Sequence, residues 1–293
     1  MIRLRTVLCP VDFSPATPRQ IALAADVCRA FGGRLVVHHN RPSFGTGASV
    51  GWMYKADHRV EPPARVEARL NECLAQIPDG VAHEGLITEG PASRAVLSVA
   101  ESIDADIVVL TAHGTLSDNH ASITEQVLER SGRAVLVLHE PAVEARTPRF
   151  TTQGTDRQIV LVPTDLTAVS QSAVSLGLDL ARSLGVDVHL LHLVSPRRRD
   201  PVDEEGIRAQ LHALVPTDIA HRVTVHVEHG DVASGIARMA DRLQASCIVM
   251  GEHTRSPLRG WFGRDTPRAV LHQAHCPVWY VPASRVGAGA QTV

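Results

Sequence analysis

The sequence of this chain contains two versions of one long segment. Val7 to Ser14 reads VLCPVDFS, and Val160 to Thr167 reads VLVPTDLT. The match continues well past these residues and pairs Val36 to His39 with His189 to His192. Each version runs to roughly 140 residues, which is enough to bury a core of its own and too long for a solenoid repeat. The repeat therefore predicts two domains of one fold, which we call copy one and copy two.

The domain boundaries follow from the repeat and agree with the length of 293 residues. We place copy one at residues 1–140 and copy two at residues 157–283. Residues 141–156 are polar with scattered Thr and Pro, which predicts a linker. The small residues of segment 284–293 predict a flexible tail.

Composition excludes several classes of partner. The 29 Lys and Arg against 31 Asp and Glu give a net charge of −2, so we expect neither nucleic acid nor an anionic membrane as a partner. No apolar run reaches the roughly 18 residues of a membrane helix, and the first residues lead into a strand without the pattern of a signal peptide. We therefore expect a cytoplasmic protein. The five cysteines are scattered without a C-x-x-C pair, which predicts structural thiols.

Strand and helix patterns alternate along both copies. In copy one, the apolar runs Thr6 to Val11 and Arg34 to His39 flank a helical pattern that ends at Gly32. Because these runs are almost continuously apolar, the sheet should be parallel and covered by helices on both faces. We predict an α/β fold in which each copy is a five-stranded parallel sheet flanked by helices. The stretch from about Arg41 to Pro63 has no period and should be loosely packed.

The residues that follow the strands are the candidates for function. In an open parallel sheet, ligands bind beyond the carboxyl ends of the strands. Asp12 and Asp165 end the first strand of each copy, and the pairs His39-Asn40 and His192-Leu193 end the second. A third pair of candidate segments follows the fourth strands. These segments are Thr111-Ala112-His113-Gly114 in copy one and Gly251-Glu252-His253-Thr254 in copy two.

Taken together, these motifs resemble those of the universal stress protein family in its tandem form, over almost the whole of residues 2 to 283. The resemblance rests on the Pro-x-Asp turns after the first strands, on the turn from Met250 to Ser256, and on the segment from Val270 to Val278. It implies a Rossmann-like sandwich similar to the adenine-nucleotide hydrolases. Members that hold ATP carry Gly-x2-Gly-x9-Gly-Ser/Thr, whose amides and helix N-terminus cradle the phosphates.

Copy two keeps part of this glycine motif. Gly251 matches the first glycine, but Thr254 stands at the second, and Arg264-Asp265 replaces the Gly-Ser pair, with Gly263 one position early. Arg264 is a donor for a phosphate, whereas Asp265 would repel one. His253 and Arg255 complete the candidate residues of this loop.

Copy one departs further from the motif. Thr111 replaces the first glycine, Gly114 keeps the second, and only six residues separate Gly114 from Ala121-Ser122. Ser122 also begins the sequence SITE, a capping box, so a structural role at a helix start accounts for it. His113 occupies the loop position of His253 and is a weaker candidate of the same kind.

The strand-end residues favour copy two as the nucleotide site. By resemblance, Asp12 and Asp165 match the aspartate that contacts adenine, although a carboxylate after a strand also caps a turn or helix. Leu193 keeps the apolar character that the family places against the base, whereas Asn40 does not. We therefore expect an adenine nucleotide, ATP with Mg²⁺ or another, chiefly in copy two.

We predict neither a catalytic nor a metal site. A nucleophile elbow and an intact P-loop are both missing from the sequence, so we expect a protein that is not an enzyme, apart from slow ATP hydrolysis. Among the sixteen histidines, His226 shares a strand face with Glu228, but further metal ligands would have to come from elsewhere.

The expected function is that of a cytoplasmic stress-response regulator with a degenerate adenine-nucleotide site. The alternative is a nucleotide-independent protein-interaction module. In both cases the fifth strands, Ala134 to Leu138 and Val278 to Val281, are apolar edges that we expect to pair with each other inside one chain, as a pseudo-dimer.

Overall fold

The computed structural model describes residues 4–41, 61–112, 123–139, 158–195, 202–252 and 266–283. The expected linker at 141–156, the tail and most of the stretch between Arg41 and Pro63 lie outside these ranges. Within them, both copies have the predicted alternation of strands and helices.

The elements of copy one follow each other in the order of the sequence patterns. Its strands are β1 (Thr6–Val11), β2 (Arg34–Arg41), β3 (His83–Glu89), β4 (Ile107–Ala112) and β5 (Ala134–His139). Its helices are α1 (Thr17–Phe31), α2 (Pro63–Leu74), α3 (Ala92–Ser102) and α4 (Ile123–Arg130).

Copy two repeats this arrangement. Its strands are β6 (Ile159–Pro163), β7 (Asp187–Val194), β8 (Val223–His229), β9 (Cys247–Glu252) and β10 (Val278–Pro282). Its helices are α5 (Ala168–Leu184), α6 (Glu204–Ala213), α7 (Val232–Leu243) and α8 (Thr266–Gln273), with a short 3-10 helix, η1 (Thr217–Arg222), that the sequence patterns did not predict.

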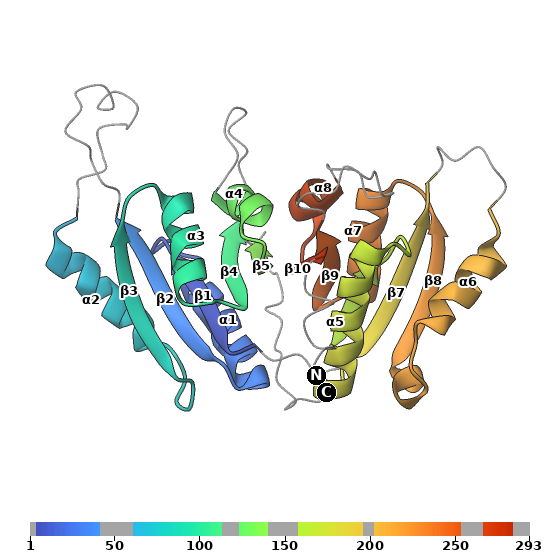
Figure 1. Ribbon diagram of the computed structural model, residues 1–293, viewed down its shortest axis with the longest axis horizontal. Coiled ribbons are helices and arrows are strands. Elements are labelled where there is room, and N and C mark those ends of the chain that lie inside the picture. Colours follow the sequence, from blue (N-terminus) through green and yellow to red (C-terminus); the bar gives the residue numbers. More distant parts are fainter. Residues whose placement is uncertain are drawn as a thin grey trace, which may run out of the picture.

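The strands of both copies form one sheet. Within the described residues it has ten strands in the order β3-β2-β1-β4-β5-β10-β9-β6-β7-β8, and Figure 1 shows β5 and β10 at the centre between the two copies. Neighbouring strands are parallel within each copy, whereas β5 and β10 are antiparallel, with Leu136 opposite Trp279. The prediction that the fifth strands cover each other is therefore confirmed.

Helices cover both faces of this sheet. Helices α1, α2, α5 and α6 pack on one face and α3, α4, α7 and α8 on the other, each group around a buried cluster that draws on both copies. On α1, the buried residues Ile21, Ala24 and Cys28 recur at intervals of three and four, as a helix with one apolar face requires. The helix ends at Gly32, whose φ of 69° is the left-handed conformation that glycine adopts without strain.

Side chains also join the two copies. The ring of Trp279, which is 1% exposed on β10, meets the ring of Phe31 on α1 edge to face, with 6.4 Å between centroids. His139, at the end of β5, bonds to the carbonyl oxygen of Leu271 on α8. Because apolar and polar contacts both cross this boundary, the two copies form one packed unit.

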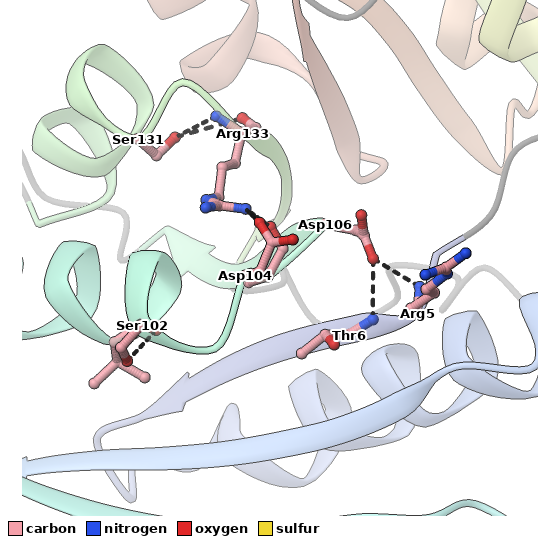
Figure 2. A network of polar contacts seen from close by, with 9 residues as sticks. Arg5, Thr6, Ser102, Asp104, Asp106, Ser131 and Arg133 are labelled. Atoms are coloured by element: carbon pink, nitrogen blue, oxygen red, sulfur yellow. Dashed lines mark hydrogen bonds and ion pairs between the residues drawn. The ribbon is translucent and has the colours of Figure 1, made fainter. Parts of the chain in front are cut away.

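Polar contacts fix the amino ends of the central strands of copy one. The Asp106 carboxylate accepts hydrogen bonds from the backbone N–H groups of Arg5 and Thr6, at 2.7 Å and 3.1 Å, and thereby ties β4 to β1 (Figure 2). Nearby, Arg133 pairs with Asp104 at 2.9 Å. This network lies at the end of β1 opposite to Asp12, so it supports the sheet and leaves the carboxyl end for a ligand.

Candidate functional site

The turn after β6 places Asp165 at the carboxyl end of the sheet. One carboxylate oxygen, Oδ1, accepts hydrogen bonds from the backbone N–H of Thr167 at 3.1 Å and from its hydroxyl at 2.6 Å. These bonds hold the turn that leads into α5. The other oxygen, Oδ2, is buried and has no hydrogen-bond partner among the described residues. A buried acceptor without a partner costs about 1–3 kcal/mol, which a donor that reached this oxygen would offset.

The next residue gives this turn an unusual backbone. Leu166 has a φ of 63°, and Phe13, its counterpart in copy one, has a φ of 59°. Bulky residues rarely adopt this left-handed conformation, and the strain is typical of functional sites. In copy two, the Thr164 hydroxyl accepts a hydrogen bond from the Leu166 N–H at 3.1 Å and lies 2.9 Å from the Ser170 hydroxyl. The turn is therefore held rigidly.

A cavity of about 330 Å³ opens beside this turn. It lies between the turn, the end of β7 and the first turns of α6. The residues that line it are Asp165, Leu166, His192, Val202, Asp203, Gly206, Ile207 and Gln210. Its volume falls in the range of small-molecule sites, and it combines apolar side chains with a few polar groups, as such sites do.

The polar side chains of the cavity differ in what they can offer. Asp203 caps α6 by accepting a hydrogen bond from the Gly206 N–H at 2.9 Å. His192 is 6% exposed, and its Nδ1 lies 3.0 Å from the carbonyl oxygen of Thr164. Because a carbonyl oxygen only accepts, Nδ1 carries the hydrogen, and this bond sets the orientation of the ring. Among these groups, Oδ2 of Asp165 is a buried acceptor without a hydrogen-bond partner among the described residues.

The side chain of Leu193, which the resemblance places against the base, packs away from this cavity. Its side chain is 6% exposed, belongs to the core on the α7 face and lies over Gly235, where an added Cβ would be 2.8 Å from Leu193 Cδ2. It does not line the cavity, because successive residues of a strand point to opposite faces. His192, one residue earlier, is the strand-end side chain at the cavity. The sequence indicated both residues as strand-end candidates, and the resemblance selected Leu193; the alternation along β7 was the signal that could have separated the two.

The copy-one counterparts of these residues form other contacts. Asn40 donates a hydrogen bond to the carbonyl oxygen of Gly90 at 2.8 Å and accepts one from the Thr88 hydroxyl at 3.2 Å. Its amide therefore joins β2 to β3 and to Gly90, the residue that follows β3. Asp12 is exposed and accepts hydrogen bonds from the Ser14 N–H at 2.9 Å and the Thr17 hydroxyl at 3.4 Å. In copy one this carboxylate therefore stabilises the turn and the start of α1.

Gly251, at the end of β9, has a structural reason to be glycine. An added Cβ would lie 2.7 Å from the carbonyl oxygen of Val169 and 3.2 Å from Cα of Ser170, both in the backbone of α5. The missing side chain lets α5 approach the strand. The other loop residues named from the sequence lie outside the described residues: His113, Gly114, Ser122, His253, Thr254, Arg255, Gly263, Arg264 and Asp265.

A pair of histidines lies on the other face of β7 from His192. Nδ1 of His189 is 2.8 Å from Nε2 of His226 on β8, and the rings stack with 5.0 Å between centroids. Burial lowers the pKa of both imidazoles. Within the described ranges, no group of three or more His, Cys, Asp or Glu side chains is arranged to hold a metal ion. Likewise, none of the described helices is long and apolar enough to cross a membrane.

The fold and the strand-end cavity define a class: doubled α/β sandwiches of the Rossmann-like kind. The universal stress protein family matches the chain twice, over residues 3–139 and 156–282. The chain therefore belongs to the universal stress protein family, as a tandem member. A search of curated protein sequences found no match.

Solved structures share the tandem fold over nearly the whole chain. A universal stress protein from Archaeoglobus fulgidus DSM 4304 is 17% identical, with 96% of this chain and 97% of that chain covered and a TM-score of 0.70. A proposed universal stress protein from Pseudomonas aeruginosa UCBPP-PA14 is 15% identical, with 95% and 93% covered and a TM-score of 0.60. At these identities the likeness concerns the fold alone.

Proposed function

We propose that this universal stress protein is a cytoplasmic regulatory protein that binds an adenine nucleotide in copy two and acts by binding rather than turnover. The base occupies the cavity beside Asp165, and the phosphates extend toward the end of β9, with Mg²⁺ present only when the nucleotide is ATP. The partnerless Oδ2 of Asp165 is the observation that carries this proposal.

The chemistry of the cavity favours adenine among the purines. A carboxylate oxygen accepts hydrogen bonds, so it attracts the 6-amino group of adenine and repels the 6-carbonyl oxygen of hypoxanthine. Leu166 and Ile207 offer apolar surface to the base. The carboxylates of Asp165 and Asp203 also make this end of the site unfavourable for phosphate, which agrees with placing the phosphates at the other end.

Calorimetric titration with AMP and IMP tests the proposal, because these nucleotides share their phosphate and differ at position 6 of the purine. The native protein should bind AMP more tightly than IMP. Asp165→Asn should weaken AMP binding about tenfold to a hundredfold, the loss of one charge-assisted hydrogen bond, and should bring IMP up to or above AMP. The amide oxygen of the asparagine can still accept the bond from the Thr167 N–H, so the turn is preserved.

Asp12→Asn is the matched control, because it alters the same turn in copy one and should leave AMP binding unchanged. A native protein that binds neither nucleotide would refute the proposal and favour the nucleotide-independent interaction module. Unchanged AMP affinity in Asp165→Asn would also refute it. A thermal melt offers a second readout, since a ligand at 100 times its Kd stabilises the native state by about 2.7 kcal/mol.

A further inference from the structure

Three stacked side chains stand in copy one at the place of the copy-two cavity. The Phe13 ring lies 4.1 Å from the His39 ring, centroid to centroid, with 24° between their planes. The guanidinium carbon of Arg69, from α2, lies over the Phe13 ring at 4.4 Å from its centroid. The two rings are therefore stacked in close contact, and the distance from the guanidinium to the ring is within the range of favourable cation–π contacts.

Hydrogen bonds hold each layer of this stack. Arg69 donates one bond to the carbonyl oxygen of Phe13 at 3.1 Å and another to the Glu61 carboxylate at 2.9 Å. His39 is held through Nδ1, which lies 2.9 Å from the carbonyl oxygen of Val11. Burial, with the nearby charge of Arg69, lowers the pKa of His39, so its ring is neutral in the stack at pH 7.

The stack and the cavity correspond residue by residue at the turn and the strand. Phe13 follows Asp12 as Leu166 follows Asp165, and both residues have the same left-handed backbone. His39 matches His192, because each ring is bonded through Nδ1 to the carbonyl oxygen that precedes the aspartate. In copy two, Leu166 and His192 line open space.

The helix beside the site provides the third correspondence. Arg69 precedes the buried Leu70 of α2, and Gln210 precedes the buried Leu211 of α6. Gln210 lines the cavity, whereas Arg69 reaches over Phe13. Copy one therefore has a flat aromatic ring and a long cation at two positions where copy two has a leucine and a glutamine.

We infer that the Phe13 ring occupies in copy one the place that the nucleobase takes in copy two. In copy two the base then stacks on His192, as Phe13 stacks on His39, and extends beneath Gln210. Copy one is closed by its own side chains, so the chain holds one nucleotide. This inference rests on the proposed function, and it identifies Phe13 and Arg69 as the residues that close the second site.

Exchanging residues between the copies tests the inference. The double variant Phe13→Leu with Arg69→Gln gives copy one the side chains of copy two, and Leu166 shows that a leucine fits this turn. Adenosine is the probe, because it needs no phosphate loop. Equilibrium dialysis should give one adenosine per native chain and two per double variant. Arg65→Gln, at an exposed position one turn earlier on α2, is the control and should leave the stoichiometry at one. A double variant that stays at one would overturn the inference.

The reverse exchange separates this inference from the proposed function. Leu166→Phe with Gln210→Arg should close copy two and reduce adenosine binding at least tenfold, with the melting temperature as a check on folding. If the native chain binds no adenosine or AMP, the proposed function fails. If it binds two molecules per chain, or if the reverse variant binds as the native chain does, the inference fails while the proposed function stands.

Discussion

Glu125 of copy one forms an ion pair with Arg268 of copy two, with 2.7 Å between Oε1 and Nε. The Glu125 side chain on α4 is 7% exposed, whereas the Arg268 side chain on α8 is 57% exposed. His272, one turn further along α8, places Nε2 3.6 Å from the same carboxylate oxygen. A nearly buried carboxylate of one copy thus contacts basic side chains of the other.

Removing the arginine should therefore weaken the contact between the copies. We expect Arg268→Ala to lower the free energy of unfolding by about 1–2 kcal/mol, because it takes away a charged partner of a carboxylate that stays buried. The exposure of the arginine keeps the effect below that of a fully buried pair. Denaturant unfolding of the native protein and of the variant measures this loss of stability.

Arg34→Ala is the matched control for this variant. Arg34 pairs with Glu84 at 2.6 Å inside copy one, but both side chains are about half exposed, so its removal should change stability much less. Equal losses in the two variants would contradict the role given to Glu125.

Acid should destabilise the protein through His38. Burial, with the nearby His39, lowers the pKa of this histidine from 6.5 to about 4. Its Nε2 bonds to the Thr88 hydroxyl at 2.7 Å, and its Nδ1 is buried without a partner among the described residues. Between these two pKa values the unfolded chain binds a proton that the folded chain does not. The contribution of His38 is therefore complete above pH 6.5 and falls as the pH drops toward 4, by roughly 3 kcal/mol in all.

The test is the free energy of unfolding as a function of pH. His38→Leu should make its fall between pH 6.5 and 4 shallower, and Leu191, the buried residue at this position of copy two, shows that leucine fits there. His212→Gln, at an exposed position on α6, should keep the native slope. A His38→Leu curve parallel to that of the native protein would show that other groups cause the acid sensitivity.

Gly251→Ala should destabilise the protein whether or not a nucleotide is bound. The added Cβ meets the backbone of α5 at Val169, so the helix must shift, and overpacking of this kind costs about 1–3 kcal/mol. Gly85→Ala is the comparison, because there the nearest atoms, at 2.9 Å and 3.0 Å, are the ends of the Leu74 and Leu70 side chains, which can rotate. Without ligand, the denaturant midpoint of Gly251→Ala should be lower than that of Gly85→Ala. Similar midpoints would mean that α5 adjusts freely to the added Cβ. Any change of AMP affinity in Gly251→Ala would then arise at the binding site.

The fold could be predicted from the amino-acid sequence alone. The repeat predicts two equal domains, and the apolar runs from Thr6 and Ile159 predict buried parallel strands, because burial on both faces of a sheet imposes a pattern that is local in the chain. The sequence also predicts that β5 and β10 pair with each other, since apolar strands at an edge need a partner. The turn with Asp165 could be identified because strand ends mark the ligand side of such sheets.

The side chains that meet at the site could not be predicted in this way, because their contacts arise from the packing of the whole domain. Alternation predicts that His192 and Leu193 point to opposite faces, but which face borders the cavity depends on how β7 lies between its neighbours and the helices. The stack of Arg69 on Phe13 joins residues 56 positions apart, and no local pattern specifies it. Gly251 likewise owes its role to the approach of α5. Such contacts depend on the register of the strands and the seating of the helices, which the whole chain sets together.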